Sequence, residues 1–136
     1  LVKLSKALDS AFYRLVSGVG NRLYSITRKN ERKLVSRSTS RKGQQLYTYQ
    51  SLAPEVKGRH MEALIVNLGE NPDEETTIHD GEEFIYVMEG RVLLKFGEDR
   101  YELEPGDSAH YLSNTPHFVA ANTGKATILA VLCGHS

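Results

Sequence analysis

The sequence is poor in cysteine and in long apolar runs, and each shortage excludes a class of protein. Cys133 is the only cysteine among 136 residues, which excludes an internal disulfide and a multi-cysteine zinc site and favours a reducing, cytoplasmic environment. No run approaches the ~18 apolar residues of a membrane-spanning helix, so we expect no membrane association. The first twenty residues lack the basic start, apolar middle and small-residue cleavage site of a secretory signal peptide. Because Leu stands at position 1, we expect the chain to be a piece of a longer protein.

Charge is balanced over the whole chain but unevenly distributed. Residues 1–60 carry 13 Lys and Arg against 3 Asp and Glu, whereas residues 61–136 carry 4 against 14. Such an asymmetry is typical of two parts with different partners, and a basic part can face nucleic acid. The alternative is that the two halves attract each other across one fold. The 40% of hydrophobic residues is sufficient for one domain with a sizeable core.

The N-terminal third predicts a helix followed by an arm. Apolar residues about four positions apart predict an amphipathic helix within residues 1–18, and Gly18 and Gly20 stand where it should end. Residues 19–45 are polar and basic without a lasting period. They predict a linker or irregular arm, with one short strand around Lys33–Ser36.

From residue 46 the apolar pattern changes to a period of two. Runs rich in Val, Ile, Tyr and Leu recur about every ten residues, with Gly, Pro, Asn and Asp between them. They predict an antiparallel all-β sandwich or barrel over residues 46–136. The expected strands are Leu46–Leu52, His60–Leu68, Glu83–Glu89, Arg91–Phe96, Arg100–Leu103, Ser108–Leu112, His117–Asn122 and Ala126–Cys133.

The residues near the middle of this domain indicate a metal-binding site. Thr77, His79 and Glu83 have the same parity, so on a strand they project to one face. If the strand that begins at His117 is a neighbour, two imidazoles and one carboxylate converge. Such a set suits one divalent metal ion, Zn, Ni, Mn or Fe, with open coordination positions. The alternative is a metal-free pocket in which these residues are hydrogen-bonded to each other, to a ligand or to a Tyr.

Two further expectations rest on strand parity. His110 shares its parity with Ser108 and Leu112 and is expected to face the same cavity, although such a residue can also be a half-buried strand histidine. Between Glu83 and Met88 both faces of the predicted strand are apolar. This predicts burial on both sides or a subunit contact, and we therefore expect a homodimer.

These residues carry a resemblance to a known family. HDGEEFIYVMEG followed by LEPGDSAHYLSNTPH resembles the two motifs of the cupin superfamily. The first family motif is His-x-His-x3-Glu-x6-Gly, and here it reads Thr77-x-His79-x3-Glu83-x6-Gly90. The turn at Pro105–Asp107 and the pair Pro116-His117 match the second motif, while Asn122 lies one residue later than usual. The likeness covers about residues 60–133.

The resemblance implies a fold and a site. The fold is a cupin-type double-stranded β-helix, or jelly-roll barrel, preceded by the short helical segment. Position by position, the matching metal ligands are His79, Glu83 and His117, whereas Thr77 replaces the first histidine of metal-binding cupins. The expected effector-binding cavity is lined by Thr77, His79, Glu83, Ile85, Val87, His110 and His117, and we assign no catalytic residue.

The N-terminus carries a second resemblance. LVKLSKALDSAFYRL is similar to the final helices of a Cro/C1-type (XRE family) helix-turn-helix domain. The resemblance implies a remnant of that domain at residues 1–18, a basic linker at 19–45 and a cupin domain at 46–136. Together these parts resemble bacterial transcriptional regulators whose cupin domain senses a small-molecule effector. DNA would be bound only through the helices that this chain lacks.

Two other classes stay open at this point. A free-standing metal-dependent cupin enzyme, of the dioxygenase or isomerase type, would use the same three ligands. A pure dimerisation module would have its barrel filled by side chains. Fold alone does not choose between them.

Overall fold

The structure, a computed structural model, describes residues 23–32, 34–39, 45–52 and 58–134. The helix predicted within residues 1–18 lies outside this part of the chain. Apart from a single 3-10 turn (η1, Lys29–Glu31), the regular structure of the described residues is β. No helix among them is long and apolar enough to cross a membrane. The strands are β1 (Leu34–Thr39), β2 (Gln45–Ser51), β3 (Met61–Leu68), β4 (Glu82–Glu89), β5 (Val92–Phe96), β6 (Asp99–Leu103), β7 (Ser108–Leu112), β8 (His117–Ala121) and β9 (Ala126–Cys133).

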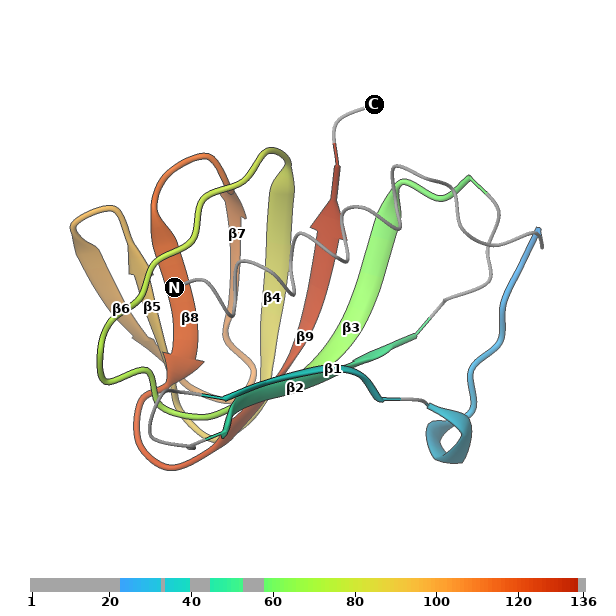
Figure 1. The fold of residues 1–136 in the computed structure, drawn as a ribbon, viewed down its shortest axis with the longest axis horizontal. Helices are drawn as coiled ribbons and strands as arrows, with labels where there is room; N and C mark the ends of the chain where they lie inside the picture. Colours follow the sequence, from blue (N-terminus) through green and yellow to red (C-terminus); the bar gives the residue numbers. More distant parts are fainter. Residues whose placement is uncertain (1–22, 33, 40–44, 53–57, 135–136) are drawn as a thin grey trace.

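The strands form two antiparallel sheets. One has the order β1-β2-β3-β9-β4-β7 and the other the order β6-β5-β8. Figure 1 shows β3, β9, β4 and β7 side by side, with β8, β5 and β6 grouped at one end of this row. The all-β, jelly-roll prediction is confirmed, and each of the eight expected strands is present with ends within one residue of those predicted.

One segment predicted as linker belongs partly to the larger sheet. Leu34–Thr39 forms β1 and pairs with β2, for example Arg37 with Thr48. This strand is longer than the short one expected at Lys33–Ser36. Because β1 hydrogen-bonds to β2, the β structure begins before residue 46, within the segment 19–45 that was predicted to be a linker.

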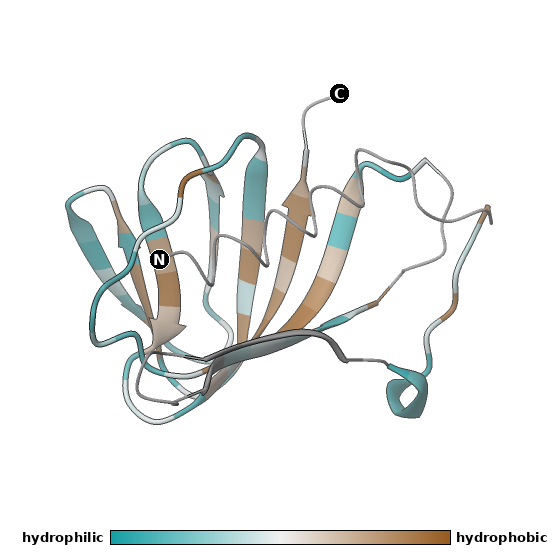
Figure 2. Cartoon of the chain, in the orientation of Figure 1, coloured by the Kyte–Doolittle hydropathy of each residue, from teal (hydrophilic) through white to brown (hydrophobic). Residues whose placement is uncertain are grey.

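The core lies between the two sheets and follows the period of two. In β9 every second residue from Ala126 to Leu132 is buried, and in β4 the buried residues are Glu83, Ile85 and Val87. Figure 2 shows β3 and β9 as predominantly apolar and the loops at the strand ends as predominantly polar. Each fully buried Val, Leu or Ile contributes ~1.5–3 kcal/mol, so these alternating positions stabilise the fold.

Gly90 allows the chain to leave the larger sheet after β4 and enter the smaller one as β5. It has a φ of +76°, and a Cβ on this residue would lie 2.4 Å from the carbonyl oxygen of Lys125. Any side chain would therefore clash with the backbone before β9. The glycine that ends the first sequence motif is required by this close approach.

Candidate metal centre

The segment before β4 is fixed to the start of β8 by main-chain hydrogen bonds. Thr77 and His117 form an isolated antiparallel bridge, in which the two N–H···O bonds measure 2.8 and 3.0 Å. The His79 N–H donates to the carbonyl of Ser113 at 2.9 Å, and the Ser113 N–H donates to that of Gly81 at 2.9 Å. Two segments far apart in sequence are thereby joined at one end of the barrel.

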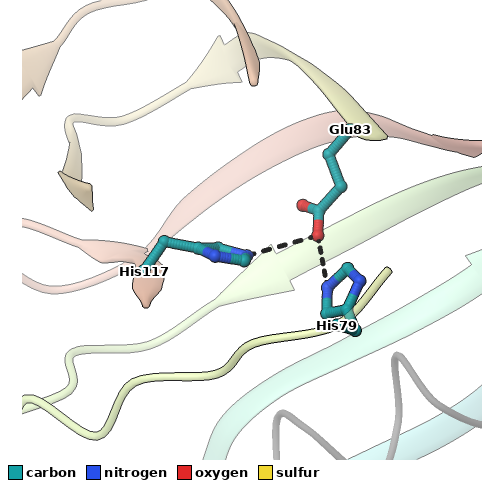
Figure 3. Close-up of side chains that lie close together, drawn as sticks. All are labelled: His79, Glu83 and His117. Carbon is teal, nitrogen blue, oxygen red and sulfur yellow. Dashed lines mark ion pairs between the residues drawn. The ribbon is translucent and has the colours of Figure 1, made fainter. Parts of the chain in front are cut away.

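His79, Glu83 and His117 meet at this junction, as predicted. Their ligand atoms all lie within 4.8 Å of one another. Glu83 Oε1 lies 2.8 Å from His79 Nε2 and 3.4 Å from His117 Nε2. In Figure 3 both imidazoles point toward the same carboxylate oxygen. All three side chains are at least nine-tenths buried, so water screens their charges weakly.

The ring of His117 is oriented by the main chain. Its Nδ1 lies 2.7 Å from the carbonyl oxygen of Thr115, and since a carbonyl only accepts, Nδ1 carries the proton. In the neutral ring Nε2 therefore presents a lone pair toward Glu83, and this buried nitrogen has no hydrogen-bond partner among the described residues. His79 is arranged similarly, with Nδ1 3.3 Å from the carbonyl oxygen of Asp80. Both histidines thus direct Nε2 toward one point, as metal-binding histidines do.

Glu83 is held in its ionised form. Burial raises the pKa of this carboxyl, but the adjacent imidazoles of His117 and His79 and the hydroxyl of Tyr111 outweigh it and lower the pKa to about 2. Tyr111 Oη donates to Glu83 Oε2 at 2.7 Å, and Ser113 Oγ donates to Oε1 at 3.4 Å. Burial and the adjacent Glu83 charge raise the pKa of Tyr111, which keeps it a donor.

The described side chains fit a divalent metal ion. Two neutral imidazole nitrogens and one carboxylate oxygen are ligands that Zn, Fe, Ni and Mn accept. The partnerless Nε2 of His117 is a buried lone pair that an ion would satisfy. The three side chains form a two-histidine, one-carboxylate set, and three protein ligands leave the other coordination positions of the metal open.

The remaining predicted site residues divide between two locations. Thr77 is buried beside His117. Ile85 and Val87 share the inward face of β4 with Glu83, as predicted, and lie in the hydrophobic core; their contact with a ligand stays a prediction. His110 is different. Its side chain is 61% exposed and pairs with Glu82 on the outer face of β4, so the expectation that it faces the cavity was wrong.

Sequence reasoning missed Tyr111 and Ser113. Tyr111 lies directly opposite Glu83 in the pairing of β4 with β7, which explains why its hydroxyl reaches the carboxylate. In β7 the inward residues are Ala109 and Tyr111, while Ser108, His110 and Leu112 point outward. The polar residues Ser108 and His110 indicated that these positions face outward. The apolar Leu112 at the next position of the same face obscured this pattern.

A second buried carboxylate lies in the same row of the larger sheet. Glu62 of β3 and Glu83 of β4 both pair with Leu132 of the intervening β9. Glu62 accepts a 2.6 Å hydrogen bond from Ser51 and forms an ion pair with Arg59. A guanidinium thus neutralises Glu62 within the protein, whereas the described partners of Glu83 are two imidazoles and two hydroxyls. This difference makes Glu83 the metal-ligand candidate.

A cavity of about 570 Å³ lies at the opposite end of the larger sheet. No predicted site residue lines it, and every polar side chain expected to bind a metal is remote from it. The cavity is therefore separate from the metal centre, and its size gives no information about that centre. It is lined by Tyr47, Thr48, Asn67, Leu68, Gly69, Glu89, Gly90, Lys125, Ala126 and Thr127.

Comparisons with solved structures show relatives of two kinds. The crystal structure of Fe(II) HppE in complex with substrate is 27% identical, with a TM-score of 0.69 over 85% of this chain and 65% of that one. The hydroxypropylphosphonic acid epoxidase from S. wedmorenis is 27% identical, with a TM-score of 0.65 over 85% of this chain and 63% of that one. An HTH_3 family transcriptional regulator from Vibrio cholerae is 24% identical, with a TM-score of 0.54 over 66% of this chain and 52% of that one.

The extent of these matches bears on what they show. This chain spans less than two thirds of the length of each of these three proteins. At 24% identity the regulator shows a shared fold alone. No curated protein matches the chain significantly. The family model described as Cupin domain matches residues 64–133, which include all three ligand candidates, and the chain therefore belongs to the cupin family.

Proposed function

We propose that this chain is the small-molecule-sensing and dimerisation domain of a DNA-binding transcriptional regulator, and that its sensing site is a divalent metal ion held by His79, Glu83 and His117. The observation that carries the metal part is the buried Nε2 of His117, which lies 3.4 Å from Glu83 Oε1 but makes no hydrogen bond among the described residues. The regulator part rests on the helix-turn-helix resemblance of residues 1–15 and on the basic N-terminal half.

The protein's own groups prepare the site for a ligand. When bound, the metal ion acts as a Lewis acid that attracts an oxygen donor. Thr115 orients His117 through Nδ1, and Tyr111 holds Glu83 Oε2 so that Oε1 faces the histidines. Tyr111 also packs its ring 5.0 Å from that of His117, which excludes water. An acidic small molecule that binds the open positions through a carboxylate is the effector class that this chemistry favours.

Strand β4 connects the sensing site with the proposed dimer contact. Its inward face carries Glu83, and its outward face carries Phe84, Tyr86 and Met88, which are 38%, 41% and 44% exposed. An apolar sheet face of this kind supports pairing with a second copy. Because both faces belong to one strand, an effector bound to the metal that Glu83 holds can shift the dimer contact. A coupling free energy of ~1–3 kcal/mol between effector binding and the dimer contact is sufficient for a regulatory switch.

A metal-dependent enzyme is the second candidate, favoured by a specific observation. The two-histidine, one-carboxylate set with open positions is typical of non-haem iron oxygenases. Four HppE structures with Fe(II) or Co(II) are 26–28% identical to this chain. In such an enzyme His79, Glu83 and His117 would hold the metal to which a substrate binds. Tyr111 would keep its proton and continue to donate a hydrogen bond to Glu83.

Metal titration followed by a turnover assay tests and separates these functions. Chelator-stripped protein is titrated with Zn, Ni, Mn and Fe(II), in the wild type and in His117→Ala. We expect a one-to-one complex that the variant loses. If the wild type binds no ion at millimolar concentration, the centre is a metal-free pocket.

The Fe(II)-loaded protein is then mixed with a panel of organic acids in an oxygen electrode. An acid that binds without oxygen uptake or chemical change supports the sensor, whereas turnover supports the enzyme. The regulator part is tested separately with the full-length gene product, whose affinity for its own promoter DNA should change on adding the bound acid. An unchanged affinity would contradict it.

A further inference from the structure

Thr77 has an unusual environment for a hydroxyl. Its side chain is 4% exposed, and its Oγ1 has no hydrogen-bond partner among the described residues. A buried polar atom without a partner costs free energy. Native proteins rarely retain such an atom unless water, an ion or a ligand satisfies it. The hydroxyl of Thr77 therefore indicates a missing partner.

The backbone places the side chain of Thr77 on the same face as the imidazole of His117. Thr77 and His117 exchange two main-chain hydrogen bonds. Residues directly opposite each other in an antiparallel pair project their side chains to the same face. Since the imidazole of His117 projects toward Glu83 (Figure 3), the side chain of Thr77 lies beside it on the side of the ligand set.

The chemistry of the position indicates what the hydroxyl binds. A neutral hydroxyl is a poor metal ligand, so the coordination position that a histidine would occupy at residue 77 stays open. The hydroxyl keeps one proton to donate. A ligand that satisfies both the ion and this proton carries an anionic oxygen, because such an oxygen coordinates the metal and accepts a hydrogen bond.

On this basis we propose that the Thr77 hydroxyl donates a hydrogen bond to a carboxylate oxygen of the molecule bound at the metal, which makes Thr77 a specificity-determining residue. The inference rests on the proposed metal site and its carboxylate effector, and it adds the protein group that recognises this carboxylate. It also assigns a role to the replacement of the first motif histidine by threonine: the replacement exchanges a fourth protein ligand for a binding position with its own donor.

Cobalt(II) and acetate are suitable probes for this role. Stripped protein is loaded with Co(II), whose visible spectrum reports the coordination, and acetate is added as the carboxylate. Thr77→Val keeps the shape and removes the hydroxyl, Thr77→Ser restores it, and Thr127→Val makes the same change at the far end of β9. We expect Thr77→Val to weaken acetate binding by about tenfold or more, as loss of a hydrogen bond to a charged group does, with cobalt affinity nearly unchanged. Thr77→Ser and Thr127→Val should resemble the wild type.

Thermal unfolding of the metal-free proteins supplies a second measurement. Because the hydroxyl has no described partner, Thr77→Val should melt at the same temperature as the wild type or higher. A lower melting temperature would show that the hydroxyl bonds within the protein and would overturn the inference. Thr77→Ala, which also lacks the hydroxyl, repeats the acetate titration and should show the same loss of acetate affinity.

The outcomes separate the two proposals. Equal acetate affinities in the cobalt-loaded wild type and Thr77→Val would overturn the role of Thr77 and leave the metal site intact. If the wild type binds no cobalt, the metal site itself is wrong, and the role of Thr77 is overturned with it.

Discussion

The two faces of β4 carry neighbouring carboxylates that both contact histidine, yet only one face forms a site. On the outer face Glu82 lies 2.6 Å from His110, with side-chain exposures of 38% and 61%. On the inner face Glu83 lies 2.8 Å from His79, with exposures of 5% and 6%. The distances are nearly equal, so proximity of a histidine to a carboxylate does not identify a functional centre.

Burial and convergence account for the difference. On the outer face water hydrates both groups and screens their attraction, and such exposed pairs contribute ~0–1 kcal/mol. On the inner face a second histidine and a tyrosine hydroxyl converge on Glu83, and together they hold its pKa at about 2 despite the burial that raises it. An ionised carboxylate kept away from water binds a cation more strongly than the same group at the surface.

Exchanging each glutamate for glutamine should give the largest contrast. Glu83→Gln removes the charged ligand and leaves a buried metal charge uncompensated. We expect it to weaken Zn or Co(II) binding by roughly 4 kcal/mol, about 1,000-fold. Glu82→Gln on the outer face should change the affinity less than twofold. Competition with a chelating dye measures both, and equal affinities for the two variants would contradict the assignment of the metal to the inner face.

Acid unfolding of the metal-free protein should show the next largest effect. The folded pKa of Glu83, about 2, lies below its ordinary value of 4.5. Its stabilising contribution is therefore complete above pH 4.5 and is lost as the pH falls toward 2. Across this window the free energy of unfolding of the wild type should fall by about 3 kcal/mol more than that of Glu83→Gln. Glu82→Gln should follow the wild type. Denaturant titrations at several pH values test this, and parallel curves for all three proteins would contradict it.

Removing one hydroxyl from each face compares two tyrosines. Tyr111→Phe deletes the donor to Glu83 Oε2 while keeping the ring. Loss of a partner that orients a metal ligand typically lowers metal affinity ~10–100-fold, and we expect a value in this range from isothermal titration. Tyr86→Phe is the matched control on the outer face, where the side chain is 41% exposed, and it should leave the affinity unchanged. A similar loss in both variants would show that the effect is not specific to Glu83.

The smallest effect concerns the apolar outer face and its proposed pairing. If Phe84, Tyr86 and Met88 contact a second copy, Tyr86→Ala should weaken the dimer by about 1–2 kcal/mol. Sedimentation velocity across a concentration series measures this shift. Tyr101→Ala, a change at an exposed tyrosine of the smaller sheet, is the control. A wild type that sediments as a monomer at micromolar concentration would refute the pairing.

Local periodicity in the sequence was sufficient to predict both faces of β4. Both faces of residues 83–88 are apolar in the sequence, but position parity alone was sufficient to place Ile85 and Val87 on the face of Glu83, as the structure confirms. In β7 the sequence SAHYL has no clear alternation, and the face of His110 was predicted wrongly. A single apolar residue among the outward positions is enough to obscure a strand of five residues.

Contacts across strands could not be predicted in the same way. Tyr111 reaches Glu83 because β7 is the neighbour of β4 in the larger sheet, and strand order is a property of the whole chain. The Thr115 carbonyl that orients His117 is a main-chain group, so no side-chain pattern reveals it. The family motifs gave the three ligand candidates, while the groups that orient them followed only from the three-dimensional arrangement.

The main-chain bridge between Thr77 and His117 has a consequence for folding kinetics. It closes a long loop that contains β4 to β7, so His117 meets His79 and Glu83 only when this loop is closed. An unfolded chain would offer a metal ion separate, weak ligands, and the ion would not nucleate folding. It would instead stabilise the native state by mass action, by ~2.7 kcal/mol at a free concentration of 100 times Kd. If the centre forms after the transition state, this gain appears mainly as slower unfolding.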